Sequence, residues 1–295
     1  MQKLISMGFL IITALFGQAK FPDTCPNGAG LPFKDIQVSH PIDKSCPSKE
    51  GDPSAPDRSH LQNAVKNNFC ASMDAPETFT PQMLIDLQAK AVDRGISSGH
   101  NQEPDNRSVL HDLGEGKVVR MKAYLIEAHH ADLGSGESVN CKKPTEEDND
   151  IHVAFGATPN TQECGSVSAE ITPHYRPASW NEIGHFETKK GNKYVPNPAY
   201  VSRLQAHPYR ITGQLFFDAS HQPCACGTAS CSGNPLRASV WEIHPVYQIE
   251  VCKHASQCRE ENDSDWTSFD EWWNNLTPIQ PAMPPHTHQP HEKKK

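Results

Sequence analysis

Five short segments between residues 118 and 252 alternate apolar and polar side chains, and their order limits the folds open to this chain. Alternation at every second residue is typical of a strand with one buried face. Val119 and Met121 mark that face in the first segment, and Ile211 and Leu215 mark it in the fourth. The predicted strands cover 118–128, 150–155, 167–171, 209–217 and 237–252. The chain is therefore predicted to be mainly β.

Three of these strands precede residues 177–207, and two follow them. That stretch contains Trp180 and at least one predicted helix. Three strands, a helical connection and two more strands is the order of the OB-fold, a five-stranded Greek-key barrel. We expect an OB-like five-stranded barrel whose last strand bends at Pro245. Small β-sandwiches share many of these cues and are the alternative.

The first nineteen residues have the pattern of a secretory signal peptide. Lys3 is their only charge, Leu4 to Phe16 is a largely apolar run, and Gly17-Gln18-Ala19 supplies small residues at a cleavage site. A transmembrane anchor is the alternative, but the run is far shorter than the ~20 residues that span a bilayer. We expect a secreted or periplasmic protein whose mature chain has no membrane span.

Ten cysteines follow the predicted signal peptide, and an even number in an exported chain indicates disulfides. A zinc site within residues 224–231 is the alternative, although its cysteine spacing differs from the usual pairs. Proximity favours a bridge between Cys252 and Cys258 and another within 224–231. The ten disulfide candidates are Cys25, Cys46, Cys70, Cys141, Cys164, Cys224, Cys226, Cys231, Cys252 and Cys258.

The segments around the barrel are predicted from local signals. Residues 20–114 form a loop-rich, helical, disulfide-tethered N-terminal region, with one helix at 60–69 after Ser59 and another starting at Thr80-Pro81. The barrel domain covers 115–276 and ends in a short helix containing Trp272 and Trp273. Residues 277–295 are rich in Pro, His and Lys, and we expect them to be disordered.

A sequence pattern in the second half of the chain resembles that of a group of uncharacterised bacterial exported proteins. Its most distinctive part is the Trp-Glu-Ile-His-Pro-Val segment at 241–246. The resemblance covers about residues 115–275 and implies an OB-like domain, but it implies no activity. The other matching positions are 138–141, 149–152, 173–177, Thr212-Gly213-Gln214-Leu215, Asp218, His221 and Arg237.

Two carboxylate–imidazole pairs are the candidates for chemistry. Asp150 and His152 are two residues apart, as are Glu242 and His244, so each pair projects from one face of its strand. If the two strands bring the pairs together, the four side chains could bind a divalent metal or act as general acid and base. The structural alternatives are cross-strand ion pairs on a half-solvated face, or contacts of Glu242 and His244 that hold nearby loops.

Other polar residues on or beside the predicted strands are candidates for ligand binding, and the overall charge restricts the ligand. The net charge is -8, and residues 117–253 hold 13 Lys/Arg against 14 Asp/Glu, so nucleic acid is an open but not a favoured partner. The ligand-binding candidates are Glu170, Arg210, Asp218 and Arg237.

Three functions remain open from the sequence. The first is an exported OB-like binding module for an extracytoplasmic ligand, which predicts an open groove with exposed aromatic side chains. The second is a metal-assisted hydrolase of nuclease or phosphodiesterase type using Asp150, His152, Glu242 and His244. The third is a structural envelope protein. Serine-hydrolase, P-loop and dinucleotide-binding motifs are absent from the sequence.

Overall fold

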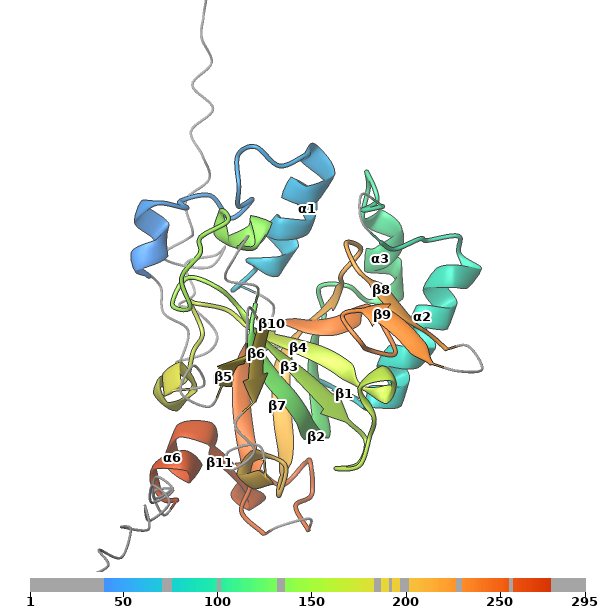
Figure 1. The fold of residues 1–295 in the computed structure, drawn as a ribbon. Helices are drawn as coiled ribbons and strands as arrows, with labels where there is room; N and C mark the ends of the chain where they lie inside the picture. The colour runs from blue at the N-terminus through green and yellow to red at the C-terminus, as the bar shows by residue number, and fades with distance from the viewer. Residues whose placement is uncertain are drawn as a thin grey trace, which may run out of the picture.

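A computed structural model describes nine segments of the chain (Figure 1). The described segments are 40–70, 76–99, 102–131, 136–182, 187–190, 193–196, 202–226, 230–254 and 257–276. The predicted signal peptide and the predicted Pro/His/Lys tail lie outside these residues. In the part that the structure describes, no helix is long and apolar enough to cross a bilayer.

The protein is mainly β, and its centre is a closed barrel of five strands. Around the ring, β2 pairs with β3, β3 with β4, β4 with β10, β10 with β7, and β7 again with β2. Only the β4–β10 contact within this ring is parallel. The barrel strands are β2 (Val118–His130), β3 (Ile151–Gly156), β4 (Val167–Ile171), β7 (Pro208–Phe217) and β10 (Trp241–Cys252).

Alternation along the strands fills the barrel with apolar side chains, as the sequence predicts. Met121, Val153, Ala169, Ile211 and Ile243 are all buried in one core cluster. The predicted irregularity near Pro245 is present, because the pairing of β10 with β7 shifts register on both sides of Val246. β10 begins at Trp241 and not at Arg237.

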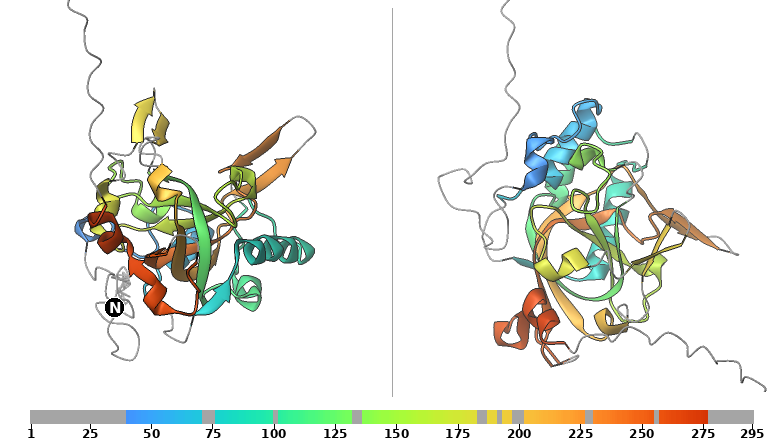
Figure 2. Two further views of the ribbon diagram at one scale, coloured as in Figure 1. Left: turned by 90° about the horizontal axis from the view of Figure 1, so that it is seen from below. Right: turned by 60° about the vertical axis from the view of Figure 1, so that its left-hand side comes forward.

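Short strands extend the barrel sheet at two places, and two hairpins lie outside it. β1 (Glu77–Phe79) pairs with β2, and β11 (Trp266–Ser268) pairs with β10. The hairpin of β8 (Gln222–Cys226) and β9 (Cys231–Asn234) projects from the barrel in Figure 2. In the 177–207 stretch, the described residues contain a 3-10 helix and a second hairpin, β5 (Glu187–Lys190) with β6 (Lys193–Pro196).

Among the described residues, three α-helices precede the barrel. The second, α2 (Pro81–Asp93), begins as predicted: Thr80 caps it by accepting a hydrogen bond from the Met83 amide. Because Ser239 donates to the Leu84 carbonyl, α2 is fixed beside the start of β10. The first helix starts before Ser59 and ends before residue 69. Helices α1, α3 and α6 cover Asp57–Lys66, Ser108–Leu113 and Phe269–Asn274, and the 3-10 helices η1 to η5 cover Pro41–Lys44, Ser138–Asn140, Glu163–Gly165, Ala178–Glu182 and Asp263–Asp265.

Disulfides connect several of these segments. The bridges Cys252–Cys258 and Cys226–Cys231, the second within 224–231, are both formed as predicted. Longer links join Cys46 to Cys141 and Cys164 to Cys224. Cys70 is disulfide-bonded as well. These bonds indicate an oxidising, extracytoplasmic environment.

Candidate metal centre

The outer surface of the barrel wall carries polar side chains on three neighbouring strands. Asp150 directly precedes β3 and His152 lies on it, Glu170 lies on β4, and Glu242 and His244 lie on β10. The apolar residues that alternate with them fill the barrel core. Since successive side chains of a strand point to opposite faces, these five polar groups share the face that turns away from that core.

Glu170 connects the two predicted carboxylate–imidazole pairs. Its Oε2 lies 2.6 Å from Nδ1 of His244, and its Oε1 lies 3.6 Å from Nε2 of His152. Nε2 of His244 is in turn 3.6 Å from Oδ2 of Asp150, and its Nδ1 is 3.5 Å from Oε1 of Glu242. All four predicted residues therefore belong to one network, which we call the Glu170 network.

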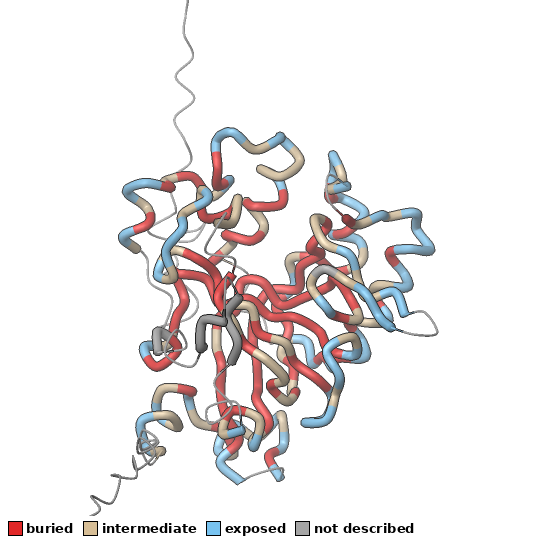
Figure 3. The backbone as a smooth tube through the Cα atoms, in the orientation of Figure 1, coloured by how far each residue is buried: buried red, intermediate tan, exposed pale blue. Residues whose placement is uncertain are grey.

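Helix α1 lies above the upper ends of these strands in the view of Figure 1, and its side chains reach the polar groups; the barrel strands are largely buried (Figure 3). The Lys66 ammonium at its end lies 3.4 Å from Oε2 of Glu170, and its Gln62 donates to the carboxylate of Asp218. Just beyond the helix, Asn68 donates to Gln214 on β7. The covered carboxylates are almost fully buried, with Glu170 only 1% exposed. These polar groups are therefore buried between the barrel and the N-terminal segment.

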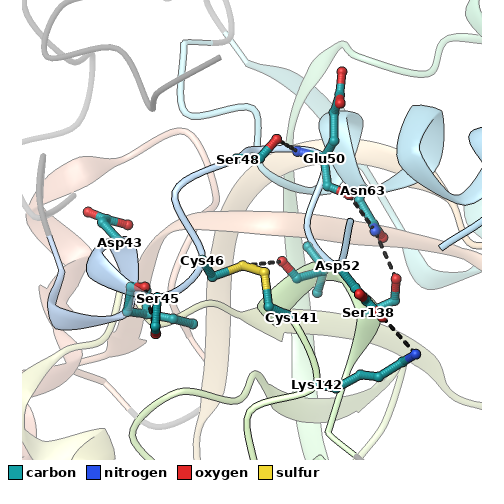
Figure 4. The surroundings of a disulfide bond; sticks show 12 residues. Asp43, Ser45, Cys46, Ser48, Glu50, Asp52, Asn63, Ser138, Cys141 and Lys142 are labelled. Atoms are coloured by element: carbon teal, nitrogen blue, oxygen red, sulfur yellow. Dashed lines mark hydrogen bonds and ion pairs between the residues drawn. A yellow bond between two sulfur atoms is a disulfide. The ribbon is translucent and has the colours of Figure 1, made fainter. Parts of the chain in front are cut away.

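The loop between β2 and β3 positions Asp150 and His152. Oε1 of Glu137 lies 3.1 Å from Nε2 of His152, while Oε2 of Glu137 accepts a hydrogen bond from the Asp150 amide. Asn140 donates to Oδ1 of Asp150 at 2.9 Å. The neighbouring Cys141 is bonded to Cys46, which ties this loop to the segment before α1 (Figure 4).

A second set of charges adjoins the network where β7 ends and β10 begins. The buried Arg237 guanidinium donates to both Glu242 and Asp218. Asp218 also accepts a hydrogen bond from Ser220 and pairs with Nδ1 of His221. The His221 side chain is 30% exposed, so this imidazole is held by a buried carboxylate and still reaches solvent.

Burial and negative charge act against each other on the two imidazoles of the Glu170 network. Burial lowers the pKa of His244, but the adjacent Glu170 carboxylate outweighs it and raises the pKa to about 9. Burial likewise lowers the pKa of His152, and Glu170 with Glu137 raises it to about 10. The network therefore attracts positive charge strongly enough to overcome the cost of burial.

The carboxylates of the network also shift the pKa values of the other titrating groups. Burial and then the nearby Glu137 raise the pKa of Asp150 to about 7. Burial lowers the pKa of Lys66, but Glu170 outweighs it and holds that pKa well above the ordinary value. Five buried or partly buried carboxylates meet here, Lys66 and Arg237 pair with members of the group, and the raised pKa values keep His152 and His244 protonated near neutral pH. The carboxylates are Glu137, Asp150, Glu170, Asp218 and Glu242.

Several buried polar atoms of the network lack well-aligned hydrogen bonds within the described residues. They are Oδ2 of Asp150, Oε1 of Glu242 and both ring nitrogens of His244. Their neighbours lie at ion-pair distance, but none completes a hydrogen bond of good geometry. Buried polar atoms in this condition are costly unless a further group satisfies them.

Three sets of side chains in the network have ligand atoms within 4.8 Å of one another, which is the spacing that a single metal ion requires. We call Asp150, Glu170 and His244 the inner set, and Glu137, His152 and Glu170 the outer set. The third set is Glu170, Asp218 and Glu242, but Arg237 already donates to two of its members. The sulfurs of Cys164, Cys226 and Cys231 are also close together, but all three are in disulfides.

The structure separates one predicted ligand-binding residue from the others. Arg210 pairs with Glu250 and Asp263 and packs over the Trp266 ring, so its guanidinium is already fully engaged. The other three candidates, Glu170, Asp218 and Arg237, lie in or beside the network.

Neither Lys66 nor Glu137 was among the predicted site residues. Lys66 lies on a helix that precedes the barrel, and Glu137 lies in a loop without periodicity. A strand pattern therefore has no signal for either residue. The nearby residues Asn140 and Cys141 belong to the segment 138–141 that matches the exported proteins, and this match was the sign in the sequence that the loop matters.

Comparison with known proteins found no matching family model, no matching curated protein and no matching solved structure.

Proposed function

We propose that this protein is an exported, OB-like barrel protein that binds a divalent transition-metal ion at the inner set. The OB class is supported by the strand ring, in which the third and fifth barrel strands pair in parallel and the fourth closes on the first. Export is supported by the disulfides and by the signal-peptide pattern of residues 1–19. The proposed kinship with exported proteins carrying the 241–246 segment fits, since that segment supplies Glu242 and His244.

The metal proposal depends mainly on one observation. Oδ2 of Asp150 and Nε2 of His244 are buried, lie 3.6 Å apart and have no hydrogen-bond partner among the described residues. A cation between them and Glu170 would satisfy both atoms and would take the place of the proton that the carboxylates hold on His244. From α1, the Lys66 ammonium contacts Glu170 and lies on the Glu170 side of the set.

The ligand types favour Zn²⁺ or Mn²⁺ over Ca²⁺ and Mg²⁺. Two carboxylates with one imidazole make a mixed oxygen and nitrogen set, whereas Ca²⁺ and Mg²⁺ prefer oxygen ligands alone. Asn140 donates to Oδ1 of Asp150 and leaves Oδ2 for the ion. Such contacts behind a ligand commonly fix its orientation.

Calorimetric titration of the full chain with Zn²⁺ tests this function. The tail histidines His286, His288 and His291 are first replaced by alanine, because they could bind metal themselves. We expect tight binding that Asp150→Asn and His244→Gln each weaken at least about a hundredfold. Glu77→Gln is the control, since Glu77 pairs with Lys117 on the exposed surface. If the parent protein, both site variants and the control bind Zn²⁺ with equal affinity, the proposal is wrong and the network has a purely structural role.

A metal-assisted hydrolase is the second candidate, and the Asp218–His221 pair favours it. Asp218 is fully buried and accepts hydrogen bonds from Arg237 and Ser220, so it fixes the imidazole of His221 through Nδ1. Nε2 of that ring is thereby available to a water or a substrate, which is the arrangement of a general base. One Asp218 ligand atom also lies within 4.8 Å of one from Glu170.

Hydrolysis of bis(p-nitrophenyl) phosphate by the Zn²⁺-loaded protein tests the second candidate. His221→Gln should reduce turnover by about a hundredfold or more while leaving the Zn²⁺ content unchanged. His111→Gln is the control, because the His111 ring is hydrogen-bonded to the Glu115 carbonyl and belongs to none of the metal-ligand sets. Turnover that is absent from the wild-type protein, or equal in both variants, would exclude this candidate for phosphodiesters.

A further inference from the structure

The two carboxylate oxygens of Glu170 face different groups. Oε2 is directed at His244, 2.6 Å from its Nδ1, and also lies 3.4 Å from the Lys66 ammonium. Oε1 is directed at the opposite imidazole, 3.6 Å from Nε2 of His152. A carboxylate whose oxygens face two separate ligand groups has the geometry of a bridge between two metal ions.

The group on the Oε1 side is itself a set of metal-ligand types. Glu137, His152 and Glu170 place one ligand atom each within 4.8 Å of the others. They come from three different segments: the loop after β2, strand β3 and strand β4. Their composition of two carboxylates and one imidazole repeats that of the inner set, with Glu170 common to both.

The two sets differ in their access to solvent. Side chains of Asp150 and His244 are at most 1% exposed, whereas those of His152 and Glu137 are 19% and 18% exposed. Beyond them, the partly exposed His129 ring lies 5.5 Å from the His152 ring, and Glu127 pairs with His129. The outer set is therefore the side of the centre that water and dissolved ions can reach.

We propose that the outer set binds a second divalent ion, so that Glu170 bridges a two-metal centre with one buried and one solvent-facing position. This inference rests on the proposed function, because the inner ion is its first member. The outer position is the one where an ion can retain water or contact a small anionic ligand. The buried position serves to hold the bridging carboxylate and its charge.

The number of bound ions tests the second position. The full chain with the three tail histidines replaced should bind about two Zn²⁺ ions, measured by elemental analysis after desalting. His152→Gln and Glu137→Gln should each reduce the content to about one ion and change the remaining affinity less than about threefold. Glu170→Gln should remove both ions, and Glu77→Gln should retain both.

Manganese loading provides an independent readout. Two Mn²⁺ ions joined by one carboxylate are magnetically coupled, so their paramagnetic resonance spectrum differs from that of isolated Mn²⁺. The wild-type chain should show the coupled spectrum, and His152→Gln should show isolated Mn²⁺ only. Thermal unfolding of each variant should confirm that it is folded before its metal content is compared.

The possible outcomes separate this inference from the function on which it rests. One ion per chain, lost in His244→Gln and unaffected by His152→Gln, would overturn the second position and leave the inner site standing. If no ion binds to the folded wild-type chain, both proposals fail. An ion lost in His152→Gln but retained in His244→Gln would overturn the inner site instead.

Discussion

Oε2 of Glu170 lies 2.6 Å from Nδ1 of His244, across the contact between β4 and β10. These two strands form the one parallel pair of the barrel ring, with Ser168 opposite Glu242 and Ala169 opposite Ile243. Two residues further along each strand, on the face of Ser168 and Glu242, are Glu170 and His244. The register of the two strands therefore brings them together. The position of the candidate centre thus follows from how the barrel closes.

Replacing Lys66 with methionine should strengthen metal binding and weaken the metal-free fold. The Lys66 ammonium lies 3.4 Å from Oε2 of Glu170 and therefore repels a cation held by the same carboxylate. Its removal should tighten Zn²⁺ binding roughly tenfold or more. The metal-free protein should lose about 3 kcal/mol of stability, because the buried carboxylates lose a counter-ion. Calorimetry and urea unfolding measure the two effects, and unchanged Zn²⁺ affinity would contradict the assignment.

Replacing Cys46 and Cys141 with serine should affect both stability and metal binding. Their bridge (Figure 4) spans 95 residues. Cys141 lies in the same loop as Glu137 and Asn140, which contact His152 and Asp150. We expect a loss of roughly 2–5 kcal/mol in urea unfolding and a lower Zn²⁺ affinity. The matched control replaces Cys226 and Cys231, which close a short hairpin, and it should leave Zn²⁺ affinity unchanged. Equal Zn²⁺ affinity in both double variants would show that the loop needs no tether.

Asp52 should stabilise the fold in a pH-dependent way. Its hydrogen bond from Lys142 and that from the Ser54 amide lower its pKa to about 2. A carboxyl group with a lowered pKa in the folded state stabilises that state above its ordinary pKa, near 4, and loses this effect as the pH falls through 2. Asp52→Asn should cost about 1 kcal/mol at pH 6, since Lys142 is largely exposed and solvent screens the pair. The difference in urea unfolding should vanish near pH 2. A difference that persists there would have another cause.

Gly213 should tolerate no side chain. A Cβ atom at this position on β7 would lie only 2.5 Å from the Pro245 carbonyl oxygen and would also overlap the Ile243 side chain. Gly213→Ala should therefore destabilise the barrel by about 1–3 kcal/mol. Gly95→Ala is a useful comparison, because nothing lies within 4 Å of a Cβ at Gly95, although its positive φ adds strain of its own. Thermal unfolding compares the two variants, and a Gly213→Ala protein as stable as wild type would refute the close-packing explanation.

The barrel strands could be predicted from the sequence because their apolar periodicity is local. The fifth strand was predicted to begin at Arg237 but begins at Trp241. Arg237 lies before the strand and forms ion pairs with Asp218 and Glu242. In the described part of 177–207, residues 202–204 are helical, and a 3-10 helix and a hairpin precede them.

The candidate site could be predicted only in part. Strand parity correctly placed the two carboxylate–imidazole pairs on a face away from the core, but it could not show which strands lie side by side. The contribution of Lys66 depends on a helix far from the barrel in sequence, and that of Glu137 depends on a loop fixed by a disulfide. Arg210 was selected by its strand position, and its partners are Glu250, which lies opposite it on β10, and Asp263, which follows that strand in the chain.

The parallel β4–β10 contact has a consequence for how such a protein would respond to its surroundings. Glu170 and His244 become neighbours only when β4 and β10 pair, so an ion that needs both ligands binds the folded state and not the unfolded chain. At a free-ion concentration about a hundred times the dissociation constant, this preference would add about 2.7 kcal/mol to the free energy of unfolding. Metal supply outside the cytoplasm would then help to determine how many copies survive there in native form.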